Sequence, residues 1–411
     1  MPLDGGGAAR EASSRMRVQD QPTVASTWWT WCRVAALTAG LAVLAWQGWH
    51  MATAILDVQP LGIDFLPMWA GAHEAFIHPQ RVYDFVRLTH FESPLLGDFH
   101  GLRPFVYPPT ALLLFWPFGQ LSFVTANAVW TAMGVVAILL AMALQVKTPR
   151  VIVLTAMVLT PSSVLVMLTG QVTFLVAALV VVALMALRGR PAIAGVLLGL
   201  AAALKPQALV LAPVALLAIG QWRALLAAGV TVTVLAAASV VVFGLDDWFQ
   251  WLAAAPKFEH MVMSASGFVK GMITPTALGM FLRLDPGALL IWRLAFGVGA
   301  LVMAWSVFRA TDDPARRLTA LLGGGLFITP YAMHYDAALL APAAAMILTQ
   351  RTAPGPWFAA LAASFMLCCG AIPHWGAAGV TGFVLIVALV PESAFSGRPA
   401  PAPRLAVESP A

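Results

Sequence analysis

The stretch 224-ALLAAGVTVTVLAAASVVVFG-244 runs without a single charged residue. A helix that crosses the hydrocarbon core of a bilayer needs about 20 predominantly apolar residues. This stretch is long enough to cross on its own, and it ends just before the acidic pair Asp246–Asp247. It therefore predicts a transmembrane helix, and the rest of the chain can be compared with it.

The composition extends that prediction to the whole chain. Apolar residues make up 60% of the sequence and charged residues 10%, and the mean hydropathy is +0.85, whereas soluble domains are about a quarter charged. The sequence predicts an all-α polytopic integral membrane protein with about 12 spans. We expect these spans at residues 31–53, 120–146, 151–168, 172–187, 191–204, 208–220, 224–244, 287–308, 318–330, 337–349, 356–371 and 376–391.

These apolar runs form one membrane domain over residues 28–392. The polar segments 1–27 and 393–411 are expected to be disordered cytoplasmic tails. The first apolar run lacks a small-residue cleavage site, so we interpret it as a retained span and not as a signal peptide. The three cysteines lie in or beside apolar runs, which argues against a disulfide framework.

The basic residues predict the orientation, because short cytoplasmic loops are enriched in Lys and Arg. With the N-terminus inside, all eight histidines fall on or near the outer face, which carries two long segments at 54–107 and 245–286. This arrangement predicts a multi-pass protein of the cell inner (plasma) membrane whose active site faces the extracytoplasmic side. The basic residues assigned to the cytoplasm are Arg10, Arg15, Arg17, Arg33, Lys147, Arg150, Arg188, Arg190, Arg223, Arg309, Arg316, Arg317, Arg351, Arg398 and Arg404.

One carboxylate stands out in the first outer segment, in 61-LGIDFLPMWAGAHEAF-76. Asp64 lies between Ile63 and Phe65, in front of a stretch that can form a short amphipathic helix in the membrane interface. Asp64 is then either the N-cap of that helix or a general base facing an acceptor hydroxyl. Position alone favours the cap.

A series of short motifs follows Asp64. In order they are 83-YDF-85, 106-VYPPTALLLFWPF-118, 168-LTGQVTFLVAAL-179 and 194-AGVLLGLAAALKPQALVLAP-213. This order resembles glycosyltransferase family 87 of the GT-C superfamily, over roughly residues 55–345. Each motif is common by itself, and the resemblance lies in their order together with the membrane topology.

The resemblance implies a GT-C-type bundle of about 12 transmembrane helices with an elaborated first extracytoplasmic loop. It implies an inverting glycosyltransferase that moves a sugar, typically mannose, from a polyprenyl-phosphate carrier to a hydroxyl of a lipid or glycan acceptor. Such enzymes carry an acidic residue just after the first span, and the matching position here is Asp64. The resemblance thus favours a catalytic base over a helix cap.

The leaving group of that reaction is a lipid phosphate, which a cation should face. Lys205, in 204-LKPQ-207, is the main candidate because it lies at the outer end of a short span. The alternative is a snorkelling lysine that complements the helix dipole. Arg103 and Lys270, in the two long outer segments, are further candidates for binding the donor phosphate.

Three more residues belong to the expected site. His334, in 329-TPYAMHYDAAL-339, lies where members of the family often carry a histidine, and either contacts the donor phosphate or the acceptor, or only ends a helix. Gln171 and Tyr107 are expected to bind substrate. His73 and His78 are five residues apart, which does not place two ligands on one helix face, and no metal, cofactor or nucleic-acid partner is expected.

Two other functions would use a similar outer face. One is a transporter or flippase of lipid-linked saccharides, although transporters usually show internal repeats and ionisable groups near the midplane. The other is a ligase that joins a polysaccharide to a lipid. Both would need the same membrane and the same kind of lipid-linked partner.

The orientation gives a direct prediction. Cysteines introduced at Asp98 and at Asp313 should be labelled from opposite sides of the membrane by an impermeant thiol reagent, Asp98 from outside and Asp313 from inside. Labelling of both positions from the same side would contradict the topology.

Overall fold

A computed structural model describes residues 24–56, 60–97, 101–146, 150–349, 356–368 and 376–390. All of the regular secondary structure in these residues is helical. One isolated antiparallel bridge joins Met272 and Met333. The all-α prediction is therefore confirmed for the described residues. The expected tails lie outside them, except for residues 24–27 at the start of the first helix, as do Asp98, His100, Cys369 and His374.

Most of the expected apolar runs are helical, but the runs at 208–220, 318–330 and 337–349 are each divided among shorter helices. Many of the helices begin with proline in the first turn, where its missing N–H costs no hydrogen bond. In chain order they are α2 Val24–Leu56, α3 Leu66–Glu74, η1 Pro79–Arg81, α4 Phe85–Leu96, α5 Pro109–Gly119, α6 Phe123–Ala143, α7 Arg150–Val158, α8 Pro161–Thr169, α9 Thr173–Ala186, α10 Pro191–Leu204, η2 Pro206–Leu209, α11 Ala212–Ala218, α12 Trp222–Phe243, α13 Asp246–Ser264, α14 Ser266–Gly271, α15 Pro275–Phe281, α16 Pro286–Ala310, α17 Pro314–Leu318, η3 Thr319–Gly323, α18 Gly324–Ile328, η4 His334–Leu339, α19 Ala341–Thr349, α20 Pro356–Cys368 and α21 Gly376–Leu389.

Three of the described helices, α6, α12 and α16, are both long and apolar enough to cross a membrane. The expected span at 151–168 is instead a bent pair, α7 and α8, with an angle of 59° between them. The bend falls where Pro161 starts α8, because proline keeps the preceding residue, Thr160, out of the helical conformation. Counted as one broken span, this pair raises the number of candidates to 4.

Small residues allow a close contact between two of these helices. Helix α10 packs along α12, and Gly195 and Gly199 of α10 face it one turn apart. A Cβ atom added at Gly195 would lie 2.2 Å from the carbonyl oxygen of Ala224, and one added at Gly199 would lie 2.7 Å from Cβ of Thr231. Such a spacing of glycines lets two backbones approach closely, as in membrane helix pairs.

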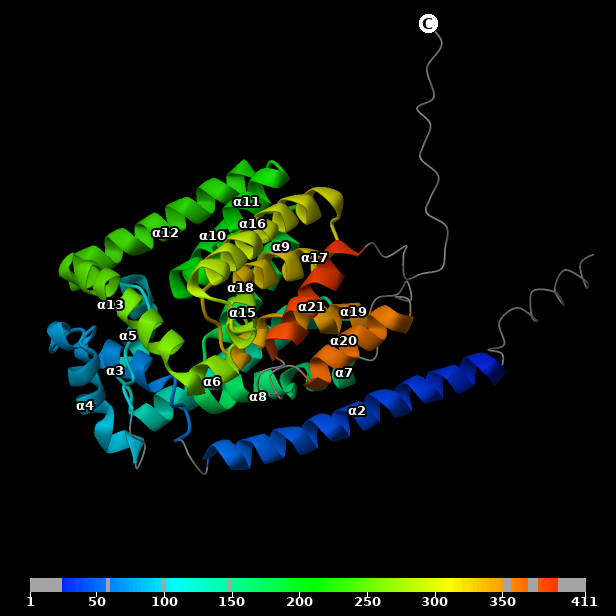
Figure 1. Ribbon diagram of the computed structural model, residues 1–411, viewed down its shortest axis with the longest axis horizontal. Helices are drawn as coiled ribbons and strands as arrows, with labels where there is room; N and C mark the ends of the chain where they lie inside the picture. Colours follow the sequence, from blue (N-terminus) through cyan, green and yellow to red (C-terminus); the bar gives the residue numbers. More distant parts are fainter. Residues whose placement is uncertain are drawn as a thin grey trace, which may run out of the picture.

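The chain separates into two chemically different ends. Helices α3, α4, α5 and α13 gather at one end of the bundle, on the left in Figure 1. Helices α3, α4 and α13 come from the two long segments assigned to the outer face, and α5 begins just after the first of these segments. At the other end Asp312 forms ion pairs with Arg188 and Arg317. Turns that the arginine pattern assigns to the cytoplasmic side thus meet each other.

The short helix expected after Asp64 is present as α3, but its expected amphipathic character is wrong. Of its nine residues, all except His73 are buried. The reason is that α3 packs against both α4 and α5, and Gly119 of α5 lets the backbones touch. A Cβ at Gly119 would lie 2.8 Å from backbone atoms of Ala72 and His73.

The contact between α10 and α12 predicts the effect of a single methyl group. Gly195→Ala should lower the apparent melting temperature in detergent, by an amount corresponding to about 1–3 kcal/mol, because the obstacle is backbone and cannot move aside. Gly229→Ala, in α12, is the matched control, since nothing lies within 4 Å of a Cβ there and alanine favours the helix. Equal melting temperatures for both variants would contradict the close packing.

Candidate active site

Asp64 lies in a tight turn that is fixed to the end of α8. Gly62, at φ 77°, allows the left-handed turn, and its N–H donates to the carbonyl of Leu168 at 2.7 Å. The N–H groups of Asp64 and Phe65 donate to the carbonyl of Thr169 at 2.9 and 3.0 Å. The carbonyls at the C-terminal end of α8, which have no partner within their own helix, therefore position this turn.

The side chain of Phe65 anchors the same turn in the core. It is fully buried and stacks on Trp130 at 5.6 Å between ring centroids, and the indole N–H of Trp130 donates to the carbonyl of Gly170 at 3.1 Å. A Cβ at Gly170 would lie only 2.6 Å from Cβ of Phe65. The close approach of Phe65 to the backbone at Gly170 thus requires a glycine at this position of the Gly170–Gln171 motif.

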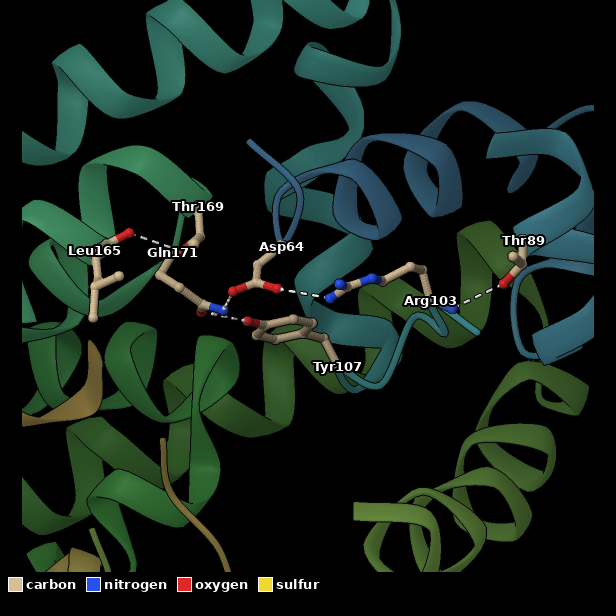
Figure 2. A network of polar contacts seen from close by, with 7 residues as sticks. All are labelled: Asp64, Thr89, Arg103, Tyr107, Leu165, Thr169 and Gln171. Atoms are coloured by element: carbon tan, nitrogen blue, oxygen red, sulfur yellow. Dashed lines mark hydrogen bonds and ion pairs between the residues drawn. The ribbon is translucent and has the colours of Figure 1, made fainter. Parts of the chain in front are cut away.

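The carboxylate of Asp64 points away from α3 and into a polar network (Figure 2). Arg103 donates to one of its oxygens at 3.2 Å and Gln171 donates to the other at 2.9 Å. Gln171 in turn accepts from the hydroxyl of Tyr107 at 3.4 Å. The N-cap of α3 is Phe65, without a capping side-chain bond, so the interpretation of Asp64 as a helix cap is wrong.

A second ion pair lies beside this network. Lys205, between α10 and η2, pairs with Asp336 of η4, and their side chains are 8% and 6% exposed. The other oxygen of Asp336 accepts the N–H of Met333 at 3.1 Å, and the ammonium of Lys205 lies 5.8 Å from the ring centroid of Tyr335. A buried, ion-paired lysine is not a snorkelling one, so that alternative for Lys205 is also wrong.

Two tyrosines join the two ion pairs into one site. Burial raises the pKa values of Tyr107 and Tyr335 well above the ordinary range, and the negative charges of Asp64 and Asp336 raise both pKa values further. Each phenol therefore lies near both carboxylates and stays protonated at neutral pH. We call this set the polar cluster, and it consists of Asp64, Arg103, Tyr107, Gln171, Lys205, Tyr335 and Asp336.

The remaining two predicted residues have different positions. His334 borders the polar cluster: its ring contacts that of Tyr335 at 6.1 Å between centroids, and its Nδ1 is 3.0 Å from the carbonyl of Gly271. Lys270 is exposed in the last turn of α14. In the part of the chain that the structure describes, no contact connects Lys270 with the polar cluster.

Sequence reasoning missed Tyr335 and Asp336, although they are the two residues that follow His334. The available signal was a carboxylate directly in front of a span in a chain with 10% charged residues. It also missed Glu92 of α4, which is fully buried with no hydrogen-bond partner for either carboxyl oxygen among the described residues. Those residues contain no group of three or more His, Cys, Asp or Glu side chains that could hold a metal ion.

Fold and site together define a multi-pass membrane protein with a carboxylate-bearing site at one end of its helical bundle. The sequence profile of glycosyltransferase family 87 matches residues 105–333. That match covers more than half of the 411 residues, and the chain belongs to this family of membrane glycosyltransferases. The comparison with curated proteins and the comparison with solved structures give no match.

The matched region includes Tyr107, Gln171 and Lys205. Asp64, Arg103 and Asp336 lie outside it in the sequence, and the fold brings them to it. The expected transferase class is confirmed by family membership, which argues against a transporter or flippase as the primary activity.

Glu92 gives a prediction about stability. Burial raises its pKa from 4.5 to about 9, an effect that the positive charge of Arg103 partly offsets. Between about pH 4.5 and pH 9 the unfolded chain loses this proton while the folded protein keeps it, so folding becomes less favourable as the pH rises, by at most about 1.4 kcal/mol per pH unit.

Glu92→Gln has no proton to retain, so its apparent melting temperature should exceed that of the wild type at pH 8 and approach it near pH 5. Glu259→Gln is the control, because Glu259 is 40% exposed and forms only a surface pair with Arg293. A constant difference between Glu92→Gln and wild type across this range would contradict a neutral Glu92.

Proposed function

We propose that the protein is an inverting glycosyltransferase that takes a sugar from a polyprenyl-phosphate carrier and transfers it to a hydroxyl acceptor on the extracytoplasmic side. The observation that carries this proposal is the carboxylate of Asp64, which makes no capping bond and is held by Arg103 and Gln171 in the polar cluster. A carboxylate that is oriented but only partly buried is suited to accept a proton from a bound hydroxyl.

The reaction needs one base and one stabilised leaving group. The acceptor oxygen attacks the anomeric carbon from the face opposite the phosphate, and its proton passes to Asp64. The bond between the anomeric carbon and the phosphate oxygen breaks, and its electron pair leaves with the polyprenyl phosphate. A single displacement of this kind inverts the anomeric configuration and needs no second carboxylate as nucleophile.

Each oxygen of Asp64 uses one lone pair for Arg103 or Gln171 and retains another for the incoming proton. Cations stabilise the negative charge that develops on the phosphate. Lys205 and Arg103 are the cations of the polar cluster, and we assign them to the donor phosphate. We assign His334, at the border of the cluster, to contact with the phosphate or the acceptor. Lys270 is exposed, and it is the less favoured candidate for binding the phosphate. Tyr107 and Gln171 line the sugar site in this proposal.

The membrane arrangement follows from the same proposal. Shorter apolar helices, among them Thr173–Ala186, Pro191–Leu204 and Gly376–Leu389, would complete a GT-C-type bundle of about 12 crossings with the membrane. The arginine-rich turns would face the cytoplasm and the polar cluster the outside, where sugar nucleotides are absent. A lipid-linked donor fits this location, and mannose is the sugar that we propose.

Asp64→Asn tests the role of the base. It should lower turnover by about 10²–10⁴ and leave the protein folded, because asparagine keeps nearly the same volume. The assay uses purified protein, radiolabelled polyprenyl-phosphate-mannose and a membrane lipid extract, with chromatography of the labelled products.

Asp84→Asn is the matched control in the same outer segment. Asp84 caps α4 by accepting the N–H groups of Val86 and Arg87 at 3.1 and 3.0 Å, and asparagine caps a helix about equally well. This variant should keep near-normal activity. Similar activity for Asp64→Asn would remove Asp64 from the chemistry.

A further inference from the structure

The ion pair between Lys205 and Asp336 lies in an unusually apolar setting. Helices α8, α9 and α19 pack against η4, and α10, α18 and η3 pack against η2. These fully described helices contain no charged residue. The titratable groups that approach the pair therefore come from the connecting segments and from η4 itself, and they are Asp64, His334, Tyr107, Tyr331 and Tyr335.

A lone ammonium in such a setting would be costly, because burial disfavours the charged form unless a partner compensates it. Asp336 is that partner, and it is fixed in its turn by the N–H of Met333. An ammonium has three N–H donors. Among the described residues one of them has a hydrogen-bond partner, Asp336, which leaves two donors for a ligand.

We propose that Asp336 is a positioning residue that keeps the Lys205 ammonium charged and directed at the donor phosphate. This inference rests on the proposed function. It adds the residue that prepares Lys205 for binding the donor phosphate. Asp336 itself touches neither the sugar nor the phosphate. The roles differ from those of the other ion pair of the polar cluster, in which the carboxylate, Asp64, carries the chemistry.

The proposal separates Asp336 from a residue that only supports the fold. In Asp336→Asn the amide oxygen can still accept the N–H of Met333, but the buried ammonium has lost its counter-charge and gives up its proton more readily as the pH rises. Arginine stays charged without such help. Replacing Lys205 by Arg in the Asp336→Asn background should therefore restore function at high pH, which a structural defect would not allow.

The test measures binding of a short-chain polyprenyl phosphate to the purified full chain in detergent, by titration of the apparent melting temperature at pH 6 and pH 8. The uncharged polyprenol of the same length reports the contribution of the lipid tail. Wild type should bind the phosphate more tightly than the polyprenol at both pH values. For Asp336→Asn the preference should be retained at pH 6 and fall by about tenfold or more at pH 8, relative to wild type at the same pH.

Two double variants complete the test. Lys205→Arg/Asp336→Asn should keep the preference for phosphate at both pH values. Lys205→Met/Asp336→Asn removes both charges, a change that buried ion pairs often tolerate without loss of stability. It should fold, and its preference for phosphate should be about tenfold or more below that of wild type at both pH values, with Arg103 accounting for what remains. If Asp336→Asn alone does not fold, the comparison of these two double variants shows whether the preference for phosphate follows the positive charge at position 205.

The inference is overturned if Asp336→Asn follows wild type at both pH values, or if the variant without either charge prefers the phosphate as strongly as wild type. The turnover of Asp64→Asn tests the proposed function separately from this inference, because binding of polyprenyl phosphate involves no proton transfer. An active Asp64→Asn protein would contradict the proposed catalytic base and leave the result for Asp336 unaffected.

Discussion

The site depends on how the turn at Gly62–Phe65 is bound to the C-terminal end of α8. Three backbone N–H groups of the turn satisfy two carbonyls of α8 that have no partner within the helix. The buried ring of Phe65 and the close approach of Gly170 hold the turn in this position. As a result Asp64 faces Gln171, which follows the same end of α8. The first outer segment is thereby joined to the helical bundle at the point where the polar cluster forms.

A second constraint is the scarcity of charge in the bundle. Most of the charged side chains that are buried occur with a partner, among them Lys205 with Asp336 inside the bundle and Arg317 with Asp312 at the opposite end. Charges removed from water are tolerated only when they are compensated. Glu92 meets the same requirement differently, because its raised pKa keeps it neutral. The pairing means that the cations proposed for phosphate binding are already positioned in the absence of a ligand.

Much of this arrangement could be predicted from the sequence, for reasons that are local. Long apolar runs predicted α6, α12 and α16, and the arginine pattern placed the segments that carry Asp64, Gln171, Lys205 and His334 on one face, where the fold brings them together. The bend before Pro161 and the burial of α3 were not predicted, because both depend on packing between segments. The pairing of Lys205 with Asp336, 131 residues apart, has no local signal. Family membership supports the transferase class, and the details of the donor rest on chemistry at the site.

The central claim is that this site transfers a sugar from a polyprenyl phosphate with inversion. The most direct measurement is the anomeric configuration of the labelled product formed by the purified protein from polyprenyl-phosphate-mannose and membrane lipids, determined by digestion with α- and β-specific mannosidases. The account predicts a mannosylated product whose configuration is opposite to that of the donor. A product that retains the donor configuration, or a donor that remains intact, would contradict it.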